Sequence, residues 1–491
     1  MDVKTNLKCE VLVVGGGNSG LVASIEARNR GAKVVLLEKA PKKTRGGNSR
    51  LSNAYFRVAT ESQEDIKALL EGVELLKEAE IETFSKDEFY NKVMKLSDGY
   101  ADKRFTEIYV SRSLEAVMWM KGQGVQWDLN PEFAFKKGNH LYWPNHLTFL
   151  QAKGSGEGLV EMLYKSAESK GVNILYDTAA WKLTLDGSAK VCGVIAKTPE
   201  GLIQIETNHV ILTCGGFQAN PQMRASYLGT NWDLVRVRGT RYDTGDGILM
   251  AQEIGASVTG HWGGCHASVL GEDSPMVEAA SSASERYSFN YSITINRNGK
   301  RFIDEGENVT DYIYAKFGRE ILKQPGSVAF QIFDKKVFPL LRKEYQDALR
   351  VETNSIEEMA EELDINGEDL LSTISAFNRA IVNDEKEFSP HECDGRHTKG
   401  LTPDKTNWAL KIDAPPYRAY AVVCGLTMTY GGLKTNEKAQ VIDTSDRPIK
   451  GVYAVGELTG GYFYNNYPGG TGLTRGAVMG RIAGKEAVTN L

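Results

Sequence analysis

The sequence predicts an α/β fold: a discontinuous Rossmann-like domain with a second, α+β domain inserted between its two parts. The first forty residues alternate a short apolar run, a glycine turn, a helical stretch and a second apolar run. More short apolar runs follow between residues 172 and 213, and glycine-rich apolar sequence resumes from residue 422. Short apolar strands that alternate with helical patterns are typical of a parallel sheet.

The first elements form a βαβ unit. Val11–Val14 predicts a strand, residues 21–29 predict a helix, and residues 33–37 predict a second strand after Gly31. Charged sequence from 61 to about 124, with apolar positions such as Ile66 and Val73 spaced for one buried face, predicts a layer of scaffold helices.

Later segments continue the pattern. Residues 172–176, 191–196, 203–206 and 210–213 predict strands of a meander that returns to the sheet and ends in a turn at 214–216. Residues 292–301 predict a strand with a turn, and the acidic segment 344–387 predicts helices.

Length and composition limit the function classes. A chain of 491 residues with 41% hydrophobic content is expected to fold into at least two domains. Its formal net charge of -5, without a long run of one sign, argues against nucleic acid as a main partner.

The cysteines and the N-terminal sequence favour a cytoplasmic protein. The six cysteines are far apart and form no CxxC pair, which argues against iron–sulfur, c-type haem and structural zinc sites and favours a reducing compartment. The first residues contain no apolar signal region, and the run Val11–Val14 is too short to span a bilayer.

A dinucleotide motif occupies residues 15–20, GGGNSG, directly after a strand and before a helix. Gly15 permits the tight turn, Gly17 lets the backbone reach a pyrophosphate, and Gly20 lets helix and strand pack closely. Glu38 ends the second strand eighteen residues after Gly20, where a carboxylate can accept a hydrogen bond from a ribose hydroxyl. This much fits either NAD or FAD.

The C-terminal sequence favours a flavin. Residues 451–461 read as a strand that ends at Gly456 and Glu457, and residues 467–484 as a glycine turn that opens a helix. Backbone N–H groups and the positive end of a helix dipole suit the electron-rich edge of a reduced flavin.

With these motifs the sequence resembles the flavoprotein family that includes soluble fumarate reductases, 3-ketosteroid dehydrogenases and tricarballylate dehydrogenase. The resemblance covers nearly the whole chain and rests on residues 15–20, 38–39, 45–49, 244–247, 298–302, 456–461 and the C-terminal glycine helix. It is strongest toward the tricarballylate dehydrogenase branch at residues 311–318 and 466–470.

The resemblance implies an FAD-binding domain in two parts, residues 1–261 and 426–491, and a capping domain, residues 262–425, that closes over substrate at the flavin. By residue-wise matching it implies FAD contacts from Gly15, Gly17, Asn18, Ser19, Gly20, Glu38, Lys39, Arg45, Gly46, Gly47, Asn48, Ser49, Asn53, Ala180, Thr213, Gly215, Asp246, Met428, Glu457, Gly472 and Leu473.

The resemblance also bears on how the cofactor is attached. Membrane-complex relatives attach FAD covalently through a histidine near the position of Asn48. No histidine lies between Gly15 and Val58, so we expect non-covalent FAD.

Three positions depart from the family pattern. In fumarate reductases an arginine that delivers a proton follows the LysArgPhe strand, but Val309 or Thr310 stands there in this chain. Tyr467 stands where a second arginine clamps a substrate carboxylate, and Thr427 stands near a carboxylate-binding histidine. Without these groups a dicarboxylate is poorly held, so fumarate and succinate are not the expected substrates.

Other side chains are candidates for the chemistry. Tyr467 begins a TyrProGly element like that of ketosteroid dehydrogenases, in which a tyrosine hydroxyl and a glycine N–H polarise a substrate carbonyl. The alternative is that Tyr467 only packs against the flavin. Tyr312, Tyr314 and His266 are candidate proton carriers, because a phenol can serve if its pKa is lowered and a histidine titrates near neutrality.

No metal site is expected. The segment 140–146, HLYWPNH, carries two histidines but lacks acidic ligands.

The sequence therefore predicts an FAD-dependent oxidoreductase that interconverts CH–CH and C=C bonds in a small, activated organic substrate, with an unknown electron donor or acceptor. Two substrate classes stay open. Overall similarity supports a tricarballylate-like polycarboxylate, and the missing arginines support an uncharged ketone or polyphenol, as for a tetrahydrodaidzein reductase. A flavoprotein that has lost turnover and serves in electron transfer is a third reading.

Overall fold

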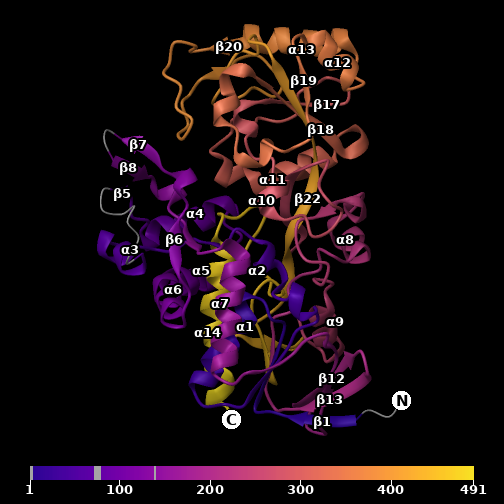
Figure 1. The fold of residues 1–491 in the computed structure, drawn as a ribbon. Helices are drawn as coiled ribbons and strands as arrows, with labels where there is room; N and C mark the ends of the chain where they lie inside the picture. Colours follow the sequence, from indigo (N-terminus) through magenta and orange to yellow (C-terminus); the bar gives the residue numbers. More distant parts are fainter. Residues whose placement is uncertain (1–3, 71–78, 138–139) are drawn as a thin grey trace. The chain divides into compact units, whose positions relative to one another are not determined.

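The computed structural model describes residues 4–70, 79–137 and 140–491 (Figure 1). The chain divides into two compact units, each described here by itself. Unit 1 comprises Met1–Asp233, Gly239–Cys265 and Met428–Leu491, and unit 2 comprises Leu234–Arg238 and His266–Thr427.

A six-stranded sheet forms the centre of unit 1. Its strand order is β10 (Asn173–Leu175), β3 (Val34–Leu37), β2 (Val11–Val14), β14 (Val210–Leu212), β24 (Pro448–Ala454) and β23 (Gln440–Ile442). The strands from β10 to β24 pair in parallel, and only β23 is antiparallel to its neighbour. β2, β3 and β14 are apolar and buried at every position, as expected for a parallel sheet covered on both faces.

A second sheet of unit 1 contains the predicted meander. β11 (Ala179–Leu185), β12 (Val191–Thr198) and β13 (Gly201–Glu206) are successive antiparallel strands, and β1 (Lys4–Lys8) adds to β13 in parallel. The next strand, β14, returns to the central sheet as predicted. β11 has no counterpart among the predicted strands, because most of its residues are at least partly exposed and give no apolar run.

Helices α1 (Asn18–Asn29) and α14 (Thr471–Thr489) pack against each other, although 441 residues lie between them in the sequence (Figure 1). Glycines at every fourth position of α14 make this possible. A Cβ atom at Gly476 would lie 2.6 Å from Ser19 Oγ, and one at Gly480 would lie 2.7 Å from the Ser19 carbonyl oxygen. At Gly484 it would lie 2.5 Å from the Ala23 carbonyl oxygen. α7 (Ser155–Ser169) packs on α1 as well.

The predicted scaffold layer is largely helical. It contains α3 (Gln63–Leu69), α4 (Lys86–Leu96), α5 (Lys103–Ser111) and α6 (Ser113–Gly122), with a short strand, β5 (Ala79–Ile81). Ser62 and Ser85 begin α3 and α4 with reciprocal capping boxes. Ile66 is buried as predicted, whereas Val73 lies outside the described residues.

Unit 2 contains a sheet in the order β15 (Arg236–Val237), β22 (Tyr417–Leu433), β18 (Val328–Asp334) and β17 (Ile293–Asn296), joined by β16 (Val258–Gly271) and β19 (Val351–Thr353). The last residues of β22 and the first of β16 belong to unit 1. The predicted helical segment 344–387 forms α12 (Ile356–Glu362) and α13 (Gly367–Ala380), whose apolar faces share a core with β17 and β18, but it also contains the strands β19 and β20 (Ile381–Val382). α11 (Thr310–Leu322) lies in the same unit.

The remaining elements are short. They are α2 (Gly47–Leu51), α8 (Pro221–Leu228), α9 (Asp246–Glu253), α10 (Ser281–Ser284), β4 (Tyr55–Phe56), β6 (Trp127–Leu129), β7 (Phe135–Lys137), β8 (His140–Trp143), β9 (Leu150–Ala152), β20 (Ile381–Val382) and β21 (His397–Thr398).

Candidate functional site

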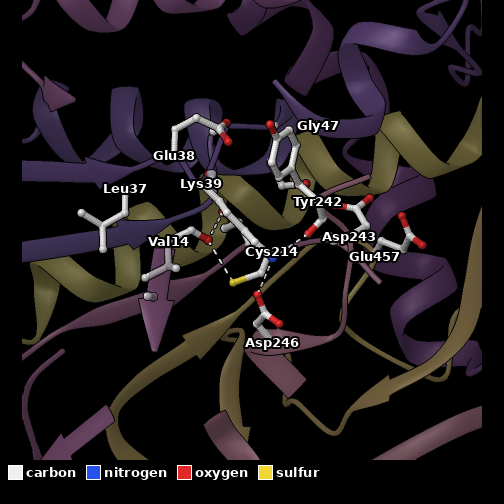
Figure 2. Close-up of a pocket in the computed structure, with 18 of the residues that line it drawn as sticks. Val14, Leu37, Glu38, Lys39, Gly47, Cys214, Tyr242, Asp243, Asp246 and Glu457 are labelled. Carbon is white, nitrogen blue, oxygen red and sulfur yellow. Dashed lines mark hydrogen bonds and ion pairs between the residues drawn. The ribbon is translucent and has the colours of Figure 1, made fainter. Parts of the chain in front are cut away.

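A pocket in unit 1 opens at the carboxyl ends of β2, β3 and β14 (Figure 2). Its empty space is about 820 Å³, including the part open to solvent. The carboxyl ends of parallel strands are where α/β sheets bind ligands. The pocket wall includes fourteen of the predicted cofactor residues: Gly15, Gly17, Asn18, Ser19, Glu38, Lys39, Gly47, Asn48, Ser49, Ala180, Thr213, Gly215, Asp246 and Glu457.

The glycine motif has the geometry that its sequence predicts. Gly15 has a φ of +111°, and a Cβ atom there would lie 2.5 Å from the Thr213 carbonyl oxygen. A Cβ atom at Gly20 would clash with the Gly15 carbonyl oxygen, so close packing of helix on turn requires glycine at this position. Gly17 immediately precedes α1, and the nearest atom to a Cβ there would be Ser49 Oγ at 3.5 Å.

Glu38 is buried beside this motif. Its Oε1 accepts a hydrogen bond from the Ala40 N–H at 2.9 Å, and its Oε2 accepts from the Gly46 N–H and the Tyr164 hydroxyl, each at 3.2 Å. Burial raises the pKa of Glu38, and these hydrogen bonds oppose that shift. Gly16, which the sequence reasoning missed, has to be glycine because the Tyr164 hydroxyl and Glu38 fill the space beside it.

Lys39 links two parts of the pocket wall. Its Nζ donates to Thr244 Oγ1 and to Asp246 Oδ2, each at 2.7 Å. Asp246 begins α9, so the ion pair fixes the end of β3 to the start of that helix. Figure 2 shows Lys39, Cys214 and Asp246 together.

Asn48 and Glu457 meet at another side of the pocket. Asn48 Oδ1 accepts the Thr240 N–H at 2.8 Å, and its side chain also hydrogen-bonds Glu457. Glu457 Oε1 accepts the Thr429 N–H at 3.0 Å. The Asn48 side chain therefore joins two parts of the pocket wall.

Seven predicted cofactor residues do not line this pocket: Gly20, Arg45, Gly46, Asn53, Met428, Gly472 and Leu473. Arg45 instead pairs with Glu161 at 2.9 Å and lies over the Tyr164 ring, and Gly46 donates to Glu38. The Leu473 carbonyl oxygen accepts from Asn18 Nδ2 at 2.9 Å, which joins α14 to the start of α1.

Several pocket residues were missed by sequence reasoning, among them Cys214, Tyr242 and Asp243. Cys214 follows β14 directly, and its position at a strand end could have identified it. Asp243 stands next to the ThrGlyAspGly motif, but only the Asp of that motif was singled out.

The pocket fits a dinucleotide. α1 has no acidic residue in its first turn, so its N-terminus retains a partial positive charge for a phosphate group. A Cβ atom at Gly47 would meet nothing within 4 Å, which leaves room along the backbone. Glu38 provides buried acceptor oxygens at the end of the second strand, where a ribose is expected.

The predicted catalytic residues fall in both units. Tyr467 belongs to unit 1, where it is 8% exposed and its ring lies 5.0 Å from that of Phe463 and 6.3 Å from that of Tyr430. This packing accounts for its position without deciding whether its hydroxyl acts on a substrate, so its catalytic role stays a prediction.

The other candidates belong to unit 2. Thr310 begins α11 and hydrogen-bonds Asn290 Oδ1, and Tyr312 is buried on the same helix. His266 is fully buried, edge to face with Tyr314 at 4.8 Å. Burial, followed by the charge of Arg238, lowers the pKa of His266 well below its ordinary value, so the expectation that it titrates near neutrality is wrong.

Arg238 is a cation that sequence reasoning missed in unit 2. Its Nε donates to Thr427 Oγ1 at 2.6 Å, and its Nη1 donates to the Tyr287 hydroxyl at 3.0 Å. Nη1 also forms a buried ion pair with Glu285. A guanidinium thus lies beside Thr427, where the family pattern has a histidine, but a carboxylate neutralises it.

Within residues 4–70, 79–137 and 140–491, no group of three His, Cys, Asp or Glu side chains is arranged to hold a metal ion. His140 instead contacts Glu80 at 3.1 Å. In the same part of the chain, no helix combines the length and apolar character needed to cross a bilayer.

Comparison with known families and structures identifies the type of domain. The sequence model of the family described as FAD binding domain matches residues 10–473. A solved structure of a flavocytochrome c3 fumarate reductase in its open conformation superposes with a TM-score of 0.75 at 27% identity, covering 99% of this chain and 79% of the other.

Curated relatives are similar over nearly the whole chain. A probable fumarate reductase of Shewanella frigidimarina is 29% identical over 483 residues, 97% of this chain and 74% of its own length. An NADH:fumarate oxidoreductase of Klebsiella pneumoniae is 27% identical over 97% of this chain, which spans 47% of that longer protein. A vinyl phenol reductase of Lactiplantibacillus plantarum is 26% identical over 97% of this chain and 96% of its own length.

Proposed function

Because this chain belongs to the FAD binding domain family, we propose that it is an FAD-dependent oxidoreductase that interconverts CH–CH and C=C bonds in an activated small organic substrate. The observation that carries this proposal is the pocket at the ends of β2, β3 and β14, which gathers the glycine turn, Glu38 and Glu457. The relatives named above, a probable fumarate reductase, an NADH:fumarate oxidoreductase and a vinyl phenol reductase, support this proposal.

The residues of unit 1 hold FAD in this proposal. The N-terminus of α1 faces the pyrophosphate, and Glu38 accepts a hydrogen bond from the adenosine ribose. The bound flavin supplies hydride transfer to or from one carbon of the substrate. The Tyr467 hydroxyl donates a hydrogen bond to the activating carbonyl or similar group of the substrate and stabilises the charge that develops there.

For the substrate we favour an uncharged, conjugated carbonyl compound or vinyl phenol. The neutralised Arg238 supports this choice, because a dianion taken out of water needs cations that are not already paired. The full-length similarity to the vinyl phenol reductase supports it as well. The motifs at 311–318 and 466–470 favour a tricarballylate-like acid as the second candidate.

Three further features belong to the proposal. FAD is held without a covalent bond, because no histidine lies between Gly15 and Val58. The protein acts in the cytoplasm, as its widely spaced cysteines suggest. Its electrons come from, or go to, a separate partner of unknown chemistry.

The test is anaerobic reoxidation of the photoreduced holoprotein by a panel of enones, vinyl phenols, tricarboxylates and fumarate. We expect fast flavin reoxidation by at least one uncharged compound and far slower reoxidation by fumarate. Comparable rates with fumarate would overturn the substrate proposal. Reoxidation by none of the panel, combined with fast reoxidation by a one-electron acceptor, would favour the electron-transfer reading.

A further inference from the structure

Two carboxyl groups in the wall of the FAD pocket, the buried Asp243 and the partly exposed Glu457, are bridged by one amide. Gln218 Nε2 donates to Asp243 Oδ2 at 2.6 Å and reaches Glu457 Oε2 at 3.5 Å. Gln218 is fully buried, and Asp243 is 7% exposed. Asp243 and Glu457 both line the pocket, and Figure 2 shows them on the same side of it.

The turn after β14 brings these groups together. A Cβ atom at Gly215 would lie 2.5 Å from Asp243 Cγ, and one at Gly216 would clash with Glu457 Oε1 and Thr429 Oγ1. The CysGlyGly turn therefore lies against both acids. Any larger side chain at these glycines would push the acids away from the amide.

No described cation is paired with either acid. Within the described part of the chain, neither Asp243 nor Glu457 forms an ion pair. The charged and titratable groups that face Asp243 are Glu457, Glu38, Lys39 and Cys214, and those that face Glu457 are Asp243 and Arg475. Lys39 is engaged with Asp246, and Arg475 lies over the Tyr462 ring at 4.3 Å with its Nη1 directed to the Thr459 carbonyl oxygen.

Two buried oxygen atoms next to Asp243 and Glu457 lack a hydrogen-bond partner within the described residues. They are Gln218 Oε1 and Thr429 Oγ1. Both atoms lie within 2.7 Å of the point that a Cβ of Gly216 would occupy, and so does Glu457 Oε1. A proton on Glu457 would give the Gln218 carbonyl oxygen a donor, which two ionised acids cannot provide.

From this arrangement we infer that Asp243 and Glu457, bridged by Gln218, titrate as one coupled pair, and that FAD binding is coupled to proton uptake by this pair. The inference rests on the proposed FAD site. Two unpaired like charges cannot both stay ionised in a buried wall, and the doubly charged pyrophosphate of FAD adds negative charge to the same pocket.

The direction of the linkage follows from charge. Burial raises the pKa of Asp243 and raises that of Glu457 to about 7, and bound FAD raises them further. The complex then holds more protons than the free protein. FAD affinity is therefore highest at a pH below the pKa that the pair has in the FAD-free protein. It falls as pH rises from that value to the pKa that the pair has in the FAD complex.

The experiment titrates apoprotein with FAD at pH 6, 7, 8 and 9 by flavin fluorescence, with calorimetry in two buffers of different ionisation enthalpy. For the wild type we expect the FAD dissociation constant to rise by up to about tenfold per pH unit above pH 7, with uptake of close to one proton per FAD. Asp243→Asn should flatten this dependence. The exposed control Glu200→Gln should keep it.

Gln218→Leu provides a second test if Asp243→Asn does not fold, because it breaks the bridge and leaves both acids in place. It should change the pH at which affinity falls. Absence of proton uptake in the wild type, or an unchanged pH profile in both Asp243→Asn and Gln218→Leu, would overturn the inference. Failure of the wild type to bind FAD at any pH would instead refute the proposed function.

Discussion

The hydroxyl of Tyr164 donates a hydrogen bond to Glu38 Oε2 across 3.2 Å, from a helix 126 residues further along the chain. The same ring lies under the guanidinium of Arg45, 4.2 Å from its centroid. The acid that ends β3 is therefore oriented by α7 as well as by the two backbone N–H groups of its own loop.

Replacing Glu38 by Ala should weaken FAD binding by about 1.5–3 kcal/mol, because it removes a hydrogen bond to a charged acceptor. Tyr164→Phe should weaken it by only about 0.5–1.5 kcal/mol, because Glu38 keeps its two backbone donors. Fluorescence titration of the apoproteins measures both values. Equal losses in the two variants, or no loss in Glu38→Ala, would show that this acid does not contact the ribose.

Acid precipitation of the purified holoprotein should release all of its flavin to the supernatant as FAD. The reason is that Asn48, whose side chain holds the Thr240 N–H and Glu457, offers no nucleophile at the attachment position. Chromatography of the supernatant identifies the nucleotide. Yellow colour that remains in the pellet contradicts this prediction.

Tyr467→Phe removes a single oxygen and leaves the ring packed on Phe463. FAD content should therefore be unchanged. If the hydroxyl stabilises developing enolate charge, the chemical step should slow by about 10²- to 10³-fold. Stopped-flow measurement of flavin reoxidation by the best substrate tests this effect. Near-normal rates would assign Tyr467 to packing alone and leave Tyr312, Tyr314 or another group to do the chemistry.

Gly480→Ala should destabilise unit 1, because the new methyl group would lie 2.7 Å from the Ser19 carbonyl oxygen and force α1 and α14 apart. The expected loss is about 1–3 kcal/mol. Gly122→Ala is the matched control: Gly122 ends α6, and a Cβ there meets nothing within 4 Å. The thermal unfolding midpoints of the two variants are compared. Similar midpoints would show that α1 and α14 accommodate the methyl group without loss of stability.

The parts of the site that could be predicted from the sequence are those whose residues lie close together in the chain at a characteristic spacing. The turn at Gly15, the packing at Gly20 and the acid Glu38 lie within one βαβ unit, where spacing alone defines their roles. Gln218 and Arg238 carry no such signature, because their roles depend on partners brought close by the fold. Arg238 pairs with Glu285, 47 residues away, and this carboxylate neutralises its positive charge. No pattern in the sequence indicates the pairing.

The low pKa of His266 could not be predicted from the sequence either, because it results from burial in the fold. A histidine in a sequence has an ordinary pKa near neutrality, and only the fold places this one beneath Tyr314 and near a guanidinium. Most of the strands could be found because apolar runs identify buried parallel strands. The half-exposed β11 could not be found in this way.

The glycine face of α14 has a consequence for how the protein forms during synthesis. α1 leaves the ribosome early, but its partner helix begins at Thr471. At about 5–20 residues per second, the first helix waits tens of seconds for that partner. During this interval β14 lacks its neighbour β24 and α1 lacks α14, so the nascent chain exposes apolar surface that chaperones recognise. Mutations on the glycine face of α14 should therefore reduce the yield of folded protein before they reduce its activity.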